Sequence, residues 1–135
     1  MAGVSFAFEK KPSAIFGFVY RPVASVKFWS GSTNDWVEII MVADSGADYT
    51  ILPRYWAGNL GINLEKEASV YKTSGVGGEV KSYFIKSWKV KLGDKNMSIP
   101  IGFLDKDDVP PLMGRQNFME NIKTIFANHV TTFDF

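Results

Sequence analysis

The sequence contains no cysteine and a single histidine, His129. The absence of cysteine excludes a disulfide framework and thiolate metal sites, and it is compatible with a reducing compartment. A lone histidine with no acid–base partner nearby in the sequence is expected to pack or to face solvent, and not to bind a metal. Chemistry built on cysteine or histidine therefore has little support in this chain.

Neither sign of charge dominates, and no long apolar run is present. The chain has 15 Lys and Arg residues against 14 Asp and Glu residues, so nothing indicates a nucleic-acid partner or an anionic membrane surface. No apolar stretch approaches the length of a membrane span, and the N-terminal region lacks the order of a signal peptide. We expect a soluble, cytoplasmic protein without nucleic-acid or membrane partners.

Three acidic residues, Asp105, Asp107 and Asp108, crowd one loop. Carboxylates in a loop are the ligands that a hard cation prefers. These three lack the regular spacing and the closing glutamate of a calcium loop, so a solvated acidic turn is the better interpretation. We expect neither a metal nor another cofactor.

Most of the periodicity in the sequence is two, which is typical of β-strands. Strand-like runs cover residues 4–8, 15–20 and 23–29, and the first of them is expected to end at Lys10-Lys11-Pro12. Hydrophobic residues make up 46% of the 135 residues, enough for one domain with one core.

A long hairpin is predicted over residues 80–103, with its turn at residues 93–96. Its first strand is expected to bury one face, made of Val80, Phe84, Trp88, Val90 and Leu92. Short helices are predicted over residues 53–60 and 114–122. Many short strands with one or two short helices predict an all-β fold, either a barrel or a sandwich.

The stretch Asp44-Ser45-Gly46 follows an apolar, strand-like run at residues 37–43. An acid at the end of a buried strand, followed by a hydroxyl residue and a glycine, turns sharply and presents its carboxylate in a tight loop. Taken alone, the tripeptide is also ordinary turn chemistry. The segments downstream decide between these two interpretations.

A glycine-rich segment at residues 74–81 lies between two strand-like runs. No Gly-Lys-Ser/Thr and no helix follow it, which excludes a phosphate-binding loop. A flexible hairpin tip is the remaining interpretation, since glycines permit hinge motion and close backbone approach. Further on, residues 109–118 carry two apolar residues, Leu112 and Met113, followed by Gly114 and Arg115.

Taken in this order, the motifs resemble the retropepsin family, the retroviral-type aspartic proteases. The resemblance spans residues 20–122, and residues 21–27 look like the strand that precedes the catalytic strand. It implies a single domain over residues 1–135: a small closed β-barrel with a flap hairpin and one or two short helices. Residues 1–19 would be an N-terminal extension and residues 123–135 a C-terminal strand region. A virion or a larger precursor remains open as the biological context.

The resemblance also assigns roles to individual residues. Asp44, Ser45 and Gly46 would be catalytic, with Ser45 bonding across to a second loop. The implied substrate-binding residues are Ala47, Asp48, Gly75, Val76, Gly77 and Leu112. Gly114 and Arg115 would support the structure, with Arg115 forming a partly buried pair with Asp48. Glu79 departs from the family pattern, which usually has an apolar residue there.

The chemistry of this family needs two paired carboxylates. The chain has one Asp-Ser-Gly and half the length of a two-lobed enzyme, so the resemblance implies a homodimer with an Asp44 from each copy. The predicted function is a homodimeric aspartic endopeptidase acting on a peptide or protein substrate. Residues 130–135 alternate suitably for strands at its interface. Two alternatives stay open: a related module that dimerises or binds peptides without cleavage, and an unrelated small β-barrel binding protein.

Overall fold

Strands form most of the chain. The computed structural model describes residues 3–75 and 78–135. Within them the elements are β1 (Gly3–Ala7), β2 (Glu9–Ser13), β3 (Gly17–Arg21), β4 (Val23–Ser30), β5 (Asp35–Ala43), β6 (Thr50–Pro53), α1 (Trp56–Asn59), α2 (Leu64–Glu67), β7 (Ser69–Gly75), β8 (Gly78–Leu92), β9 (Lys95–Leu104), β10 (Leu112–Met113), the 3₁₀-helix η1 (Met119–Asn121), β11 (Lys123–Ala127) and β12 (Val130–Asp134).

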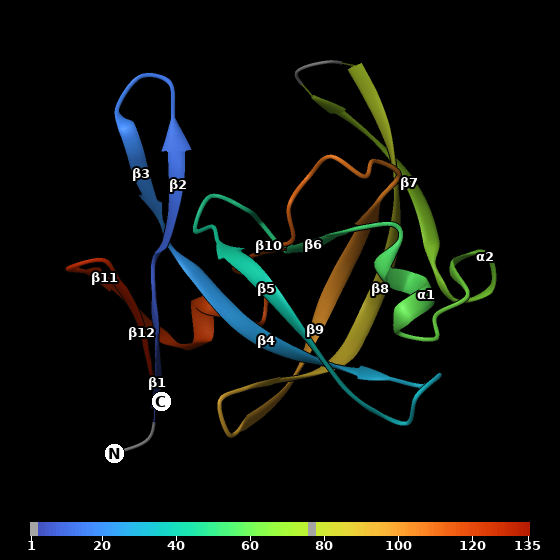
Figure 1. The fold of residues 1–135 in the computed structure, drawn as a ribbon. Coiled ribbons are helices and arrows are strands. Elements are labelled where there is room, and N and C mark those ends of the chain that lie inside the picture. The colour runs from blue at the N-terminus through green and yellow to red at the C-terminus, as the bar shows by residue number, and fades with distance from the viewer. Residues whose placement is uncertain (1–2, 76–77) are drawn as a thin grey trace.

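The largest sheet closes on itself. Its strand order is β4-β5-β10-β6-β9-β8-β7, and β4 also pairs with β8 at Phe28 and Val90 (Figure 1). Six of the strands therefore form a ring, and β7 continues from β8 as a hairpin outside it. This arrangement confirms the all-β fold class with a closed barrel. Closure leaves few unpaired strand edges in the ring.

The core fills the interior of this ring. Alternate residues of β4 and β5 point inward, as the period of a strand requires, and Phe28, Met41 and Phe103 have no exposed surface. On the return strand β9, Ile99, Ile101 and Phe103 are fully buried, and Pro100 and Gly102 between them are buried as well. Phe133 from β12 joins the same core cluster.

The buried face of β8 changes parity at a β-bulge. Ile85 pairs with Ile101 and Trp88 pairs with Ile99, so β8 contains one more residue than β9 between these two pairs. An extra residue reverses which side chains face inward. The single face predicted for the strand is correct at Val90 and Leu92 but wrong at Phe84. Tyr83 and Ile85 are buried in its place.

The C-terminal strand lies inside a sheet of its own chain. The order β1-β12-β11 places β12 in the centre, with Phe133 opposite both Val4 and Thr124. β11 and β12 join through Asn128 and His129, which both have positive φ, 53° and 59°, as a two-residue hairpin turn requires. The expectation that residues 130–135 offer strands to an interface is corrected: both edges of β12 are occupied, and the free edges of this sheet belong to β1 and β11.

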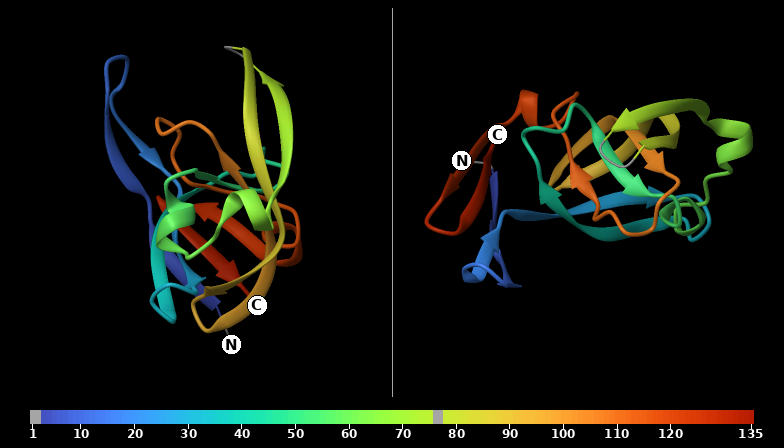
Figure 2. Two further views of the ribbon diagram at one scale, coloured as in Figure 1. Left: turned by 90° about the vertical axis from the view of Figure 1, so that its right-hand side faces the viewer. Right: turned by 90° about the horizontal axis from the view of Figure 1, so that it is seen from above.

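Strands β2 and β3 form a hairpin that projects from the body of the molecule (Figures 1 and 2). Lys10-Lys11-Pro12 lies within β2 and does not end the strand structure, contrary to the sequence prediction. Proline is tolerated there because β2 has only one partner, so its missing N–H faces no neighbour. We call residues 9–21 the arm.

Helical structure is shorter than predicted. Pro53 is the last residue of β6, and α1 begins only at Trp56. Residues 114–122, predicted as a helix, contain only the 3₁₀-helix η1. Asn117 has a positive φ of 54° and Phe118 has φ −129° and ψ −101°. These angles lie outside the α-helical region and interrupt a regular helix over this segment. In the part of the chain that the structure describes, no helix has the length and apolarity to cross a membrane.

Candidate active site

The residues Asp44 to Asp48 form a tight loop at the end of β5. The backbone N–H of Asp44 donates to the carbonyl of Met113 over 3.0 Å, and the N–H of Ala47 donates to the carbonyl of Asp44 over 3.1 Å. The carboxylate Oδ1 of Asp44 accepts a hydrogen bond from the N–H of Gly46, at 2.9 Å. The loop therefore fixes the Asp44 carboxylate through its own backbone, with the side chain half-buried.

Strand β10 threads between the two strands that flank this loop. Leu112 pairs in parallel with Val42 of β5 and in antiparallel with Ile51 of β6. A chain segment that passes between β5 and β6 holds both ends of the Asp44 loop at a fixed separation. The sequence motifs at residues 44–48 and 109–118 are thus brought together as one unit.

The segment after β10 also holds the far side of the loop. The N–H of Arg115 donates to the carbonyl of Ala47 over 3.0 Å, and that of Gln116 donates to the carbonyl of Asp48 over 2.8 Å. The N–H of Gly114 donates to the hydroxyl of Thr50, which is completely buried, over 3.2 Å. Sequence reasoning missed Thr50, because a threonine at the start of a strand carries no distinctive signal.

Gly114 is placed where no side chain fits. A Cβ at this position would overlap the carbonyl group of Tyr49 and would lie 2.7 Å from the backbone nitrogen of Thr50. Both are backbone atoms of the strand that continues the Asp44 loop, so they cannot turn away as a flexible side chain can. The supporting role that the resemblance implies for Gly114 thus has a steric cause.

Three apolar side chains form a row beside Asp44. Val42, Leu112 and Ile51 are register neighbours on β5, β10 and β6, and each is half-buried. Val42 precedes Asp44 by two residues and so shares its side of the strand, whereas Met41, Ala43 and Met113 face the core. Leu112 was a sequence-predicted binding residue, while Val42 and Ile51 were missed because they read as ordinary strand residues.

The predicted pair of Asp48 and Arg115 forms, but it is exposed in the single chain. The Arg115 guanidinium donates to Asp48 Oδ1 at 2.6 Å, and the two side chains are 84% (Asp48) and 44% (Arg115) exposed. The expectation of a partly buried bridge is therefore wrong for one protomer. Both side chains lie at the surface of the part of the chain that the structure describes.

The glycine-rich segment joins β7 to β8 as a hairpin. Gly75 ends β7 and pairs with Gly78, the first residue of β8. Val76 and Gly77, predicted as the flap tip, lie outside the described residues. Glu79, which departs from the family pattern, lies 3.5 Å from Lys72 of the opposite strand, in an exposed ion pair. The hairpin projects from the same end of the molecule as the Asp44 loop (Figure 1).

An aromatic hollow lies between this hairpin and the Asp44 loop. It has a volume of about 470 Å³ and is lined by Tyr49, Tyr71, Lys72 and Phe84. The ring of Phe84 makes edge contacts with the rings of Tyr49, 5.7 Å away, and Tyr71, 6.1 Å away. Phe84 faces this hollow because of the bulge in β8. The sequence pattern did not reveal the bulge, and it therefore predicted that Phe84 faces the core.

The other acids and the histidine lie apart from this site. Asp105, of the acidic loop, lies 3.4 Å from the Arg54 guanidinium, and His129 lies in the β11–β12 turn. Across residues 3–75 and 78–135, no group of three or more Asp, Glu, His or Cys side chains is arranged to hold a metal ion.

Comparisons with known proteins agree with this geometry. A family model described as "Aspartyl protease" matches residues 29–116. A retropepsin-like aspartic protease from Rickettsia conorii has a similar structure, with a TM-score of 0.69, 19% identity, and 98% of each chain covered. The EIAV protease, solved with the inhibitor HBY-793, has a TM-score of 0.50 and 20% identity, covering 70% of this chain and 82% of its own. No curated protein sequence matches.

Replacing Gly114 by alanine should destabilise the protein strongly. The added methyl group meets backbone atoms of Tyr49 and Thr50, and overpacking of this kind costs about 2–3 kcal/mol of unfolding free energy. Gly58→Ala is the matched control, because a Cβ there meets nothing within 4 Å. Urea unfolding of both variants measures the difference. Equal stability of the two variants would contradict the close approach at Gly114.

Removing the ion pair should matter little in single chains. Exposed pairs contribute about 0–1 kcal/mol, so the coupling energy from Asp48→Ala, Arg115→Ala and the double variant should stay below about 1 kcal/mol. All three variants retain the backbone bonds that Arg115 makes to the loop. This double-mutant cycle is measured by urea unfolding of the parent and the three variants, at a dilution where sedimentation detects only monomers. A coupling above about 2 kcal/mol would show that the pair is desolvated already in the monomer.

Proposed function

The chain belongs to the aspartyl protease family, and we propose that it is a homodimeric aspartic endopeptidase whose two Asp44 side chains activate water between them. The observation that carries the proposal is the Asp44 loop, which holds one carboxylate at the end of a strand. Its backbone donates to the carbonyl of Met113 and accepts from the N–H of Arg115, and the N–H of Gly46 donates to the carboxylate itself. Such preorganisation is what acid–base catalysis requires of its reacting group.

A second carboxylate must come from a second copy. The chain has a single Asp-Ser-Gly, and one carboxylate cannot act as acid and base in the same step. A two-fold axis beside Asp44 would place the two loops face to face. Ser45 is exposed on the loop, so its hydroxyl is available to bond with the opposite loop.

The chemistry follows from the closeness of the two acids. Two carboxylates about 3 Å apart cannot both ionise and so share one proton, an effect for which aspartic proteases are the best-known example. The ionised Asp44 takes a proton from a bound water, and the protonated Asp44 donates to the carbonyl oxygen of the substrate. Water attacks the carbonyl carbon directly, and the proton taken from water then goes to the leaving amine.

The surroundings of Asp44 suit an extended peptide with apolar side chains. The row of Val42, Leu112 and Ile51 lies on the same side of the sheet as Asp44 and offers a surface for a side chain next to the cleaved bond. The aromatic hollow at Tyr49, Tyr71 and Phe84 offers a second one, farther along the peptide. The β7–β8 hairpin would cover the peptide from above, its glycines permitting the movement.

Asp44→Asn should abolish peptide cleavage and leave the fold intact, because the amide keeps the size of the side chain but cannot ionise. Asp94→Asn, in the exposed β8–β9 turn, is the matched control and should keep full activity. Cleavage of a mixed peptide library by the purified variants gives the comparison. Substantial peptide cleavage by Asp44→Asn would contradict the assignment of Asp44 as the catalytic residue. An inactive parent that binds peptides would support the non-catalytic alternative.

The pH dependence of kcat/KM should be bell-shaped, with its maximum on the acidic side of neutral. One carboxylate of the pair must be protonated and the other ionised, so activity falls when both are protonated and again when both are ionised. The profile belongs to the pair and not to either Asp44 alone. A rate that rises steadily through pH 8 would point to a different mechanism.

A further inference from the structure

The tip of the arm is the most exposed apolar part of the described chain. Ile15 is 83% exposed and Phe16 is 74% exposed, and Phe18 on β3 is 55% exposed. The arm stands away from the barrel in each view (Figures 1 and 2). Large apolar side chains that gather at one place on a surface mark an interaction site more often than scattered ones do.

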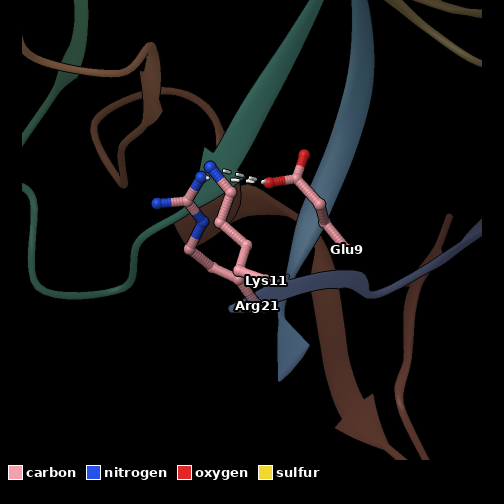
Figure 3. A network of polar contacts seen from close by, with 3 residues as sticks. All are labelled: Glu9, Lys11 and Arg21. Atoms are coloured by element: carbon pink, nitrogen blue, oxygen red, sulfur yellow. Dashed lines mark hydrogen bonds and ion pairs between the residues drawn. The ribbon is translucent and has the colours of Figure 1, made fainter. Parts of the chain in front are cut away.

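The base of the arm has polar contacts within the hairpin and one aromatic contact to the β11–β12 turn. Lys11 and Arg21 converge on the carboxylate of Glu9, at 3.5 Å and 3.1 Å (Figure 3). The ring of Tyr20 stacks on His129 of the β11–β12 turn, with 4.0 Å between centroids.

The outer half is supported by contacts within the arm itself. Lys10 lies over the ring of Phe18, 4.1 Å from its centroid. The N–H groups of Ile15 and Phe16 donate to the Ser13 hydroxyl. An isolated two-stranded hairpin is marginally stable in water. A partner that packs on the tip would add further support.

An aromatic strip connects the arm to the Asp44 loop. Phe18 and Tyr20 lie on one face of β3, and Tyr20 stacks on His129. Phe8 follows, its ring 5.9 Å from His129 and 6.4 Å from Phe126. Phe126 in turn lines a hollow of about 270 Å³ together with Ser45, the neighbour of Asp44. We call these residues, Phe8, Phe18, Tyr20, Phe126 and His129, the aromatic strip.

The arm also ends beside the Asp44 loop. Pro22, the residue after the arm, accepts a hydrogen bond at its carbonyl from the N–H of Ala43, at 3.0 Å. Ala43 directly precedes Asp44. The Phe126 end of the aromatic strip and the base of the arm therefore lie next to the loop that a second copy must approach.

We propose that the arm is a dimerisation element whose apolar tip and aromatic strip are covered by a second copy of this chain. This inference rests on the proposed function, which requires a second Asp44 at the same loop. Ile15, Phe16, Phe18, Tyr20 and Phe126 together expose on the order of 500 Å². That is more than half of the roughly 800 Å² that one partner buries in a standard interface. The arm thus adds contact area that the small loop alone lacks.

Substitutions at the tip test this inference without touching the catalytic loop. Phe16→Ser should raise the dimer dissociation constant about 10-fold, and Ile15→Ser with Phe16→Ser about 100-fold, because apolar anchors dominate interface energies. Tyr55→Ser is the matched control: Tyr55 is 53% exposed, but it precedes α1, at the opposite end of the molecule from the arm (Figures 1 and 2). Sedimentation over a dilution series measures all three constants.

The outcomes separate this inference from the proposed function. If the parent dimerises and the dissociation constants of the tip variants lie within twofold of its own, the arm proposal is overturned, while the proposed endopeptidase function stands. An unchanged dissociation constant with a raised KM would assign the tip to the substrate, and would also overturn it. A parent that stays monomeric at all concentrations would contradict both. A dimeric but inactive parent would contradict only the enzyme.

A label at the tip gives a second, independent readout. The chain contains no cysteine, so Phe16→Cys carries an environment-sensitive fluorophore at one defined position, and Tyr55→Cys provides the control. On dimerisation the emission of the Phe16→Cys label should shift to the blue, at the concentration where sedimentation detects the dimer. If the labels at both positions keep the emission of a water-exposed fluorophore in the dimer, the tip is not covered and the proposal is contradicted.

Discussion

The passage of β10 between β5 and β6 is the constraint on which the site depends. It brings the backbone of Gly114 against that of Tyr49 and Thr50, closer than any side chain would allow. Beside this contact lie the hydrogen bonds that fix the loop: the N–H of Asp44 donates to the carbonyl of Met113 on one side, and the N–H of Arg115 donates to the carbonyl of Ala47 on the other. The same passage aligns the apolar row beside Asp44. Energetically the site is thus held by backbone hydrogen bonds and close packing, while the ion pair of Asp48 and Arg115 lies exposed on its surface.

A single chain holds one Asp-Ser-Gly and, under the proposed function, only half of the catalytic pair. It holds one carboxylate in place and leaves the opposite side of the loop open to solvent. The unused features of the molecule lie on that side: exposed Ser45, the hollow at Phe126, and the arm with its apolar tip. Both edges of β12 are paired within the chain, so β12 offers no open strand edge to a second copy. The arm, with its exposed apolar tip, is the element that we propose a second copy covers.

The sequence was informative where a local rule determines the structure. Asp-Ser-Gly after a buried strand specifies a tight turn, and the alternation over residues 97–103 specifies a strand; both are present. The single buried face expected of that strand is absent, because Pro100 and Gly102 are buried together with the alternating residues. The sequence failed where a single residue changes the register. The bulge before Trp88 moved Phe84 from the predicted core to the aromatic hollow. Long-range contacts were also invisible: the hydroxyl of Thr50 is a site residue only because Gly114, 64 positions later, donates to it. No local pattern distinguishes such a threonine from any other strand residue.

The central claim is that one active site contains Asp44 from two chains, and a mixing experiment tests it most directly. Parent protein at a fixed concentration is equilibrated with increasing amounts of Asp44→Asn protein, and peptide cleavage is followed. Mixed dimers would hold one ionisable Asp44 and be inactive, so the expected result is a steady loss of activity as the inactive chain becomes the main partner. An equal excess of an unrelated protein should have no effect. Activity that stays constant in a large excess of Asp44→Asn chains would show that each chain works alone, and would contradict the account.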